Sequence, residues 1–246
     1  MPTWAMHLLT AKKISKKINI DANLFEFGNI LPDIPNGYVI QNLAHPISHK
    51  KTHFEVNVLV LEHIEKRYNL KKFAEKYKNM FSNPLMLGYY THLLTDYYWN
   101  AKTYDEYGIF DDEKNRIGLV LNNGEKLICS SEESRKIKAR DFMIYSEYIY
   151  ENKLIDKLIY DKKIKKFLKQ IEFIELNVEE INRSIQHVMD NYTGKTQILP
   201  EGINKDYKLY SKEQISESID DCVIFILKMI KKQSNLILSR QNMERK

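Results

Sequence analysis

A histidine and an aspartate in one apolar segment have the types and the spacing to bind a metal ion together. His92 and Asp96 lie four residues apart in LGYYTHLLTDYYWN, so on a helix they project from one face about one turn apart. An imidazole and a carboxylate so placed can share one divalent cation. Because an unpaired carboxylate is costly to bury, the pair needs a partner, which is either a metal ion or a Lys or Arg side chain.

Asp33 is a second candidate, in the turn-rich piece GNILPDIPNG. An aspartate beside proline commonly caps a helix or closes an Asx-turn. That structural role and the role of metal ligand both remain open from the residues alone.

Several histidines precede these residues or lie between them. His7 is on the apolar face of the first expected helix, where a lone histidine is either a core residue with its hydrogen bonds satisfied or a ligand. In HPISHKKTHFE, Pro46 interrupts the helical interval from His45 to His49. We therefore expect His45 and His49 in a loop, and His53 at the start of a helix with its ring directed inward.

Helices are the elements expected to position these side chains. The chain has only eight Gly and six Pro, which favours long helices over many turns. Apolar periodicity predicts helices over 4–18, 53–67, 70–80, 84–101, 132–151, 153–169, 173–193 and 211–240. A short apolar piece at 22–30 leads into a long loop at 31–52, and a second loop with Pro200 and Gly202 precedes the last helix.

The segment 84–101 is apolar nearly all round, so we expect it to be the central buried helix. The piece IGLVLNNGEKLIC, near 117–129, predicts one small β-hairpin around its Asn-Asn-Gly turn. No internal repeat or clear linker divides the chain. The sequence therefore predicts an all-α, single-domain helical bundle over 1–246 with one small hairpin.

Composition excludes several classes of protein. Of the 246 residues, 43% are hydrophobic, which is enough for a buried core. The net charge is +5, but the basic residues are interspersed with acidic ones rather than gathered in a stripe. We therefore expect no nucleic-acid partner. Cys129 and Cys222 lie far apart, as two reduced thiols. We find neither a signal peptide nor an apolar run of ~18 residues, and we expect a cytoplasmic protein without a transmembrane segment.

Taken in order, these pieces resemble the bacterial zinc-dependent phospholipase C family, in particular its short, leaderless cytoplasmic relatives. The matching pieces are MPTWAMHLL, FGNILPDIPNG, THFE and LGYYTHLLTDYYWN. The resemblance implies an all-α bundle that holds about one to three divalent ions, zinc first, with manganese or iron not excluded. It implies the following metal ligands, of which the second is a bridging carboxylate: His7, Asp33, His53, His92 and Asp96.

The chain departs from the family pattern at several positions. Trp4 is internal, whereas secreted members use a mature N-terminal tryptophan as a ligand. Asn100 stands four residues past Asp96, where the family often has another histidine. The nearest analogue of a downstream His-xxx-Glu pair is His187 with Asn191, which keeps the spacing but not the carboxylate. Asn100, His187 and Asn191 are thus possible additional metal ligands.

The resemblance implies a metal-dependent hydrolase of phosphodiester bonds, with Asp33 as bridging ligand and general base. Its partner would be a small phosphodiester or a phospholipid head group. Two alternatives remain. One is a non-catalytic helical binding protein that retains a structural metal, which a closed site with four protein ligands would favour. The other is an HD-type nucleotide phosphohydrolase, which is disfavoured because the chain has no His-Asp dipeptide.

Overall fold

The described part of the chain is mostly helical, as predicted. The computed structural model describes residues 1–60, 63–78, 81–169, 171, 176–196, 199 and 204–243. Its helices are α1 (Trp4–Ser15), α2 (Ala22–Gly28), the short 3-10 helix η1 (Ile34–Asn36), α3 (His49–Thr52), α4 (Leu70–Lys76), α5 (Pro84–Tyr107), α6 (Ser131–Glu151), α7 (Lys162–Leu168), α8 (Val178–Tyr192) and α9 (Lys212–Met243). The expectation of a mostly α-helical fold is confirmed.

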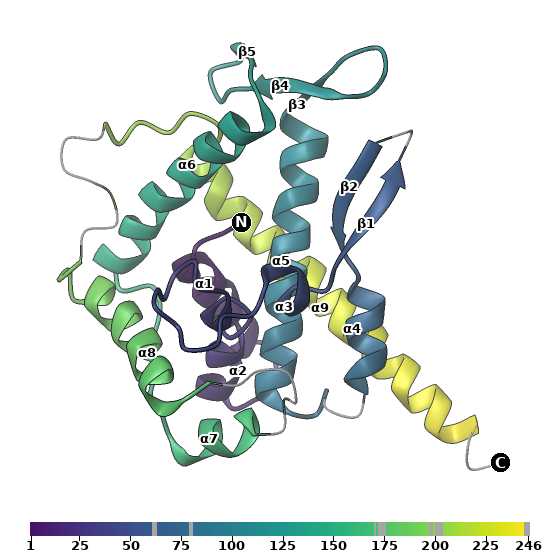
Figure 1. Ribbon diagram of the computed structural model, residues 1–246, viewed down its shortest axis with the longest axis vertical. Coiled ribbons are helices and arrows are strands. Elements are labelled where there is room, and N and C mark those ends of the chain that lie inside the picture. The colour runs from purple at the N-terminus through teal and green to yellow at the C-terminus, as the bar shows by residue number, and fades with distance from the viewer. Residues whose placement is uncertain are drawn as a thin grey trace.

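Helix α5 forms the middle of the molecule (Figure 1). It begins where the sequence predicts, because the Asn83 side chain accepts a hydrogen bond from the backbone N–H of Leu85 and Pro84 occupies the first helical position. It continues six residues past the predicted end at 101, to Tyr107. Helix α9 crosses one side of α5, and α3 lies on the opposite side, nearer the viewer in Figure 1. Burial of α5 confirms it as the central helix.

Two glycines let the backbones of α2 and α5 touch. A Cβ atom on Gly28 would overlap the carbonyl oxygen of Leu85, and one on Gly88 would overlap the carbonyl oxygen of Phe25. Any side chain at either position would therefore force the helices apart. This close contact fixes the end of α2, and with it the turn that carries Asp33, against the central helix.

Two small antiparallel sheets complete the described fold. Strands β3 (Gly108–Phe110), β4 (Arg116–Val120) and β5 (Lys126–Ile128) lie at one end of α5 in the order β3-β4-β5. The β4–β5 pair confirms the predicted hairpin near 117–129, with Gly124 in the turn at a φ of 83°. Strands β1 (Glu55–Val60) and β2 (His63–Tyr68) form a second hairpin, with Glu55 opposite Tyr68.

The helix predicted over 53–67 is wrong, because β1 and β2 occupy this segment. In EVNVLV the β-branched residues Val56, Val58 and Val60 alternate, which is a strand pattern. Phe54 adopts a φ of 53°, which ends the short α3 helix. His53 is therefore the last residue of a helical turn rather than the first of a long helix.

Other boundaries also differ from the prediction. The helix predicted over 153–169 is only α7, since Lys153 turns the chain with a φ of 52° and Asp161 caps a new helix through the N–H groups of Lys163 and Ile164. The start of the predicted helix 173–193 and the predicted loop residues Pro200 and Gly202 fall outside the described residues. In the described part, no helix has both the length and the apolarity to cross a bilayer.

Candidate metal centre

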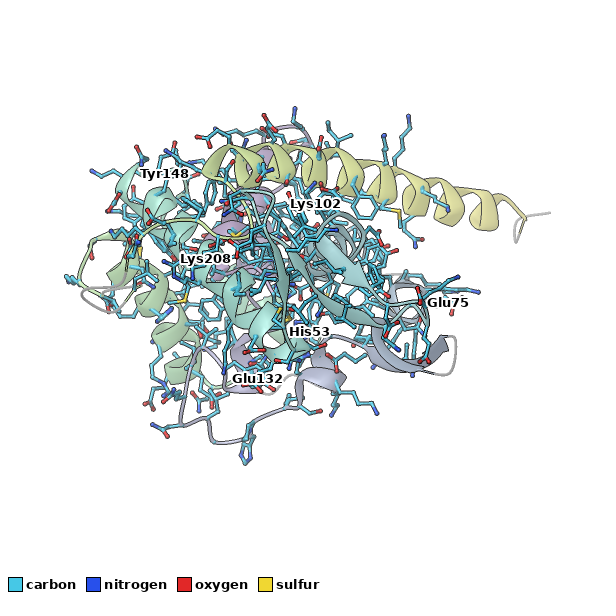
Figure 2. The ribbon with its side chains drawn as sticks, turned by 90° about the horizontal axis from the view of Figure 1, so that it is seen from above. His53, Glu75, Lys102, Glu132, Tyr148 and Lys208 are labelled. Carbon is cyan, nitrogen blue, oxygen red and sulfur yellow. The ribbon has the colours of Figure 1, made fainter. Side chains whose placement is uncertain are left out.

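The fold brings five widely separated polar residues to one buried point beside α5. His7 comes from α1, His53 from the end of α3, and His92 and Asp96 from α5; each of these four side chains is 0% exposed. Asp33 follows α2 and is 5% exposed. Figure 2 labels His53, on the side of the molecule away from α9. All five residues that the resemblance singled out as ligands lie together.

Their ligand atoms are within reach of a shared ion. Nε2 of His53 lies 3.0 Å from Nε2 of His92 and 3.4 Å from both Oδ1 of Asp33 and Oδ2 of Asp96. Nε2 of His92 is 3.5 Å from Oδ2 of Asp96, and Nε2 of His7 is 3.5 Å from Oδ1 of Asp96. Among the described residues, two of the three-residue groups whose ligand atoms all lie within 4.8 Å of one another are His7–Asp33–His92 and His53–His92–Asp96.

Hydrogen bonds to the far sides of the two closest imidazoles fix which nitrogen carries the proton. Nδ1 of His92 is 2.6 Å from the carbonyl oxygen of Asn29, which can only accept, so Nδ1 donates. Nδ1 of His53 is 2.9 Å from the Thr52 hydroxyl, which donates its own hydrogen to the carbonyl of His49. In the neutral tautomers that these contacts favour, both Nε2 atoms carry lone pairs and face each other at 3.0 Å, an arrangement that a cation between them would stabilise.

Two further residues have buried polar atoms without partners. Both ring nitrogens of His7 and both carboxylate oxygens of Asp96 are buried, and none has a hydrogen-bond partner. The His7 ring stacks on the His92 ring, with centroids 3.9 Å apart. Unsatisfied buried groups of this kind are costly. A donor set of imidazoles and carboxylates suits zinc, so the residues present fit a metal ion.

The charges in the cluster also favour a bound cation. Burial alone would raise the pKa of Asp33 and of Asp96, but the charge of His92 and its neighbours outweighs burial and holds both pKa values well below the usual range. Burial alone would lower the pKa of His92, yet Asp33 and Asp96 raise it. Burial and the charge of His92 lower the pKa of His7 to about 4. Two ionised carboxylates thus attract positive charge to this point.

His49 is a residue that the sequence analysis missed. It was expected in a loop, but it begins α3, and its ring stacks on that of His53 with centroids 3.6 Å apart. Asp33, His49 and His53 form another group with ligand atoms within 4.8 Å of one another. Nδ1 of His49 lies 2.7 Å from Oε1 of Glu55. The signal was the four-residue interval to His53, which lies after Pro46 and is uninterrupted. His45 does lie in the loop before α3, as expected.

The three possible additional ligands are placed differently. Asn100 lies one turn past Asp96 and accepts a hydrogen bond from Nζ of Lys138 at 3.0 Å. On α8, the Asn191 amide lies 3.3 Å from Nε2 of His187. None of the ligand groups found in the described residues includes His187. A metal role for these residues stays a prediction.

A cavity adjoins the cluster through Trp4. It has a volume of about 410 Å³, and its lining includes Trp4, Tyr38, Tyr150, His187 and Asn191. Nε1 of Trp4 donates to Oδ2 of Asp33 at 3.2 Å, and the Trp4 and His187 rings are perpendicular, with centroids 5.6 Å apart. Trp4 thus contacts the Asp33 carboxylate and also lines a space large enough for a small molecule.

Helices that direct histidines and carboxylates to one buried point are typical of helical metal-dependent proteins. Comparison with protein families places the chain within that class. The family model described as "Zinc dependent phospholipase C" matches residues 2–198, well over half of the chain. The chain belongs to the zinc-dependent phospholipase C family, as the sequence motifs predicted. A search of curated proteins found no match, and neither did a search of solved structures.

Proposed function

We propose that His7, Asp33, His53, His92 and Asp96 hold zinc and that the chain hydrolyses a phosphodiester. The observation that carries the proposal is the approach of Nε2 of His53 to Nε2 of His92 at 3.0 Å, beside the carboxylates of Asp33 and Asp96. A bound zinc ion supplies a water of lowered pKa and a polarised phosphoryl oxygen. The water oxygen would form a new P–O bond as one P–O bond of the diester breaks. The water would give up one proton and the leaving oxygen would gain one, so that a phosphomonoester and an alcohol are released.

Asp33 is the proposed proton acceptor for the attacking water. Nε1 of Trp4 donates to its Oδ2 at 3.2 Å, and Nδ2 of Asn36 donates to its Oδ1 at 3.2 Å, so the carboxylate is held from two sides. Its low pKa keeps it ionised as a ligand. As a weak base, Asp33 would require a water whose pKa is lowered as well, which is what a bound zinc ion would supply.

The test is hydrolysis of bis(p-nitrophenyl) phosphate and, in parallel, of a short-chain phospholipid. Asp33→Asn is expected to lower the zinc-dependent rate by about 10²-fold or more, in line with the contribution of a general base. Asp112→Asn, the same change at an exposed position, is the matched control and is expected to retain the rate. A rate that survives both chelation and Asp33→Asn contradicts the proposal.

Burial of the cluster favours one competing function, a non-catalytic protein with a structural metal. Four of the five side chains are 0% exposed, and closed sites with protein ligands alone are usually structural. The two functions predict different behaviour. A structural site holds zinc and stabilises the fold, but the zinc-loaded protein hydrolyses neither substrate. For the HD-type alternative, no observation in the described residues adds support.

A further inference from the structure

A buried lysine beside the cluster has a neutral amide as its hydrogen-bond partner. Lys138 on α6 is 7% exposed, and its Nζ donates to the neutral amide oxygen of Asn100 at 3.0 Å. Within the described ranges, the structure gives this ammonium no ion pair with an Asp or Glu. A buried cation with only a neutral partner is costly unless a further negative group approaches it. Lys138 is therefore suited to a bound anion.

The position of Asn100 places this ammonium beside the metal centre. Asn100 is four residues past Asp96 and eight past His92 on α5, so all three project from the same face of the helix. The charge of Asp96 also reaches Lys138. Burial lowers the pKa of Lys138 to about 8, and Asp96 opposes that shift. Lys138 thus contacts a residue that lies one helical turn past Asp96 on α5.

Two arginines add positive charge to the same place. Arg116 on β4 is half-buried, and Arg135 on α6 is exposed, three residues before Lys138. Arg135 is one turn before Lys138 on α6, and strand β4, which carries Arg116, packs against α6. The charges of both arginines lower the pKa of Lys138. The basic side chains of Arg116 and Arg135 thus add to the positive charge around Lys138. Such a field favours ligands with more than one negative charge, particularly when a metal ion neutralises the carboxylates.

We propose that Lys138, steadied by Asn100, binds an oxygen of a phosphoryl group at the metal centre, and that Arg116 and Arg135 make this subsite prefer dianionic phosphoryl groups. This proposal rests on the proposed function. The ligands of the subsite would be phosphate monoesters, including the phosphomonoester that diester cleavage releases. In this proposal Asn100 positions the ammonium group of Lys138. The compact charge of that ammonium suits a phosphate oxygen.

Calorimetric binding of inorganic phosphate to the zinc-loaded protein tests the subsite. Lys138→Met is expected to weaken phosphate binding about tenfold or more, because a charge-assisted hydrogen bond is lost. Lys136→Met is the matched control on the same helix, since Lys136 is exposed and paired with Glu132 at 2.8 Å. A short-chain phosphatidic acid, tested in parallel, separates a lipid phosphate from a free one, and the inference requires Lys138→Met to weaken both.

Asn100→Asp provides a second variant that leaves the lysine in place. The new carboxylate would neutralise Lys138, so phosphate binding is expected to weaken while zinc content stays the same. Tighter zinc binding with unchanged phosphate affinity would instead identify residue 100 as a metal ligand position and overturn the inference. A Lys138→Met protein with native helical signal, native zinc content and undiminished phosphate affinity also overturns it.

The outcomes separate this inference from the proposed function, because phosphate binding and zinc content are measured without turnover. A chain that binds phosphate through Lys138 but cleaves no diester overturns the proposed function alone. A chain that cleaves diesters, with a phosphate affinity that Lys138→Met leaves untouched, overturns the inference alone.

Discussion

At the residue scale, the imidazoles of the cluster depend on neighbours that are not themselves ligands. The carbonyl of Asn29 and the hydroxyl of Thr52 contact Nδ1 of His92 and of His53, and they favour the tautomers in which Nδ1 carries the proton. Partners of this kind fix the tautomer and the orientation of a metal-binding histidine. The affinity of the site therefore depends on atoms that carry no recognisable motif.

Thr52→Val tests this dependence. The change keeps the shape of a buried side chain but removes the acceptor for Nδ1–H of His53. We expect zinc affinity to fall about 10- to 100-fold, measured by competition with a chromogenic chelator. Thr193→Val is the control, because that hydroxyl bonds to carbonyls of its own helix, those of Met189 and Asp190. Native affinity in a folded Thr52→Val protein would show that the hydroxyl does not hold His53.

The candidate ligands were predictable from sequence to different degrees. The four-residue interval from His92 to Asp96 requires only a helix, and the helix is present. Asp33 and His7 carry no decisive local signal, so they emerged only from the order of several motifs. His49 was assigned to a loop because Pro46 obscured the start of α3. Asn29 and Thr52 could not be found from sequence, because their roles depend on how α2 and α3 pack against α5.

At the scale of elements, the contact between α2 and α5 holds the site together. Gly88→Ala places a methyl group against the carbonyl of Phe25, and separating the helices should cost about 1–3 kcal/mol. The same shift would draw the Asn29 carbonyl from His92 and weaken zinc binding. Urea unfolding and zinc titration measure the two effects. Ala139→Ser, which adds one atom at an exposed helical position, is the control and is expected to change neither the free energy of unfolding nor the zinc affinity. A Gly88→Ala protein in which both quantities are unchanged would contradict the role of the contact.

A buried acid on α2 makes this element sensitive to pH. Burial, assisted by the charge of Asp156, raises the pKa of Glu26 from 4.5 to about 7. Because the folded state holds this proton more tightly, the stabilising contribution of Glu26 is complete below pH 4.5 and is lost as pH rises through about 7. Glu26→Gln mimics the protonated form.

The melting temperature of Glu26→Gln relative to the unsubstituted protein should therefore increase as pH is raised across that interval. Measurements at pH values on both sides of about 7 decide the point. Glu217→Gln, at an exposed position on α9, serves as the control. A difference in melting temperature that does not vary with pH would contradict the raised pKa.

Elements with a sustained helical period were predictable, and those decided by local backbone geometry were not. The pattern of α5 was recognised, although its end at Tyr107 was not. The segment from Glu55 was read as helical because isolated apolar positions at Phe54, Val58 and Leu61 fit a helical spacing. The alternation of valines and the left-handed turn at Phe54 outweigh that spacing.

At the scale of the whole molecule, the candidate metal centre joins elements from distant parts of the chain. Helix α1 contributes His7 and also packs against α9 and α6. One connected set of buried residues runs from Trp4 on α1 to Ile226 on α9. We propose that residues 1–246 behave as a single domain, with metal binding and unfolding coupled.

The coupling predicts the response of the whole protein to chelation. An ion that binds only the folded state at 100 times its dissociation constant adds about 2.7 kcal/mol, so removing it should lower the melting temperature by roughly 5–10 °C for a chain of this size. Far-UV circular dichroism reports the helices, while fluorescence reports Trp4 beside Asp33 and Trp99 in the core. Both signals should shift together in one transition, and His92→Ala should remove the sensitivity to chelation. Two separate transitions would contradict the single domain, and equal responses of the variant and the unsubstituted protein would contradict His92 as a ligand.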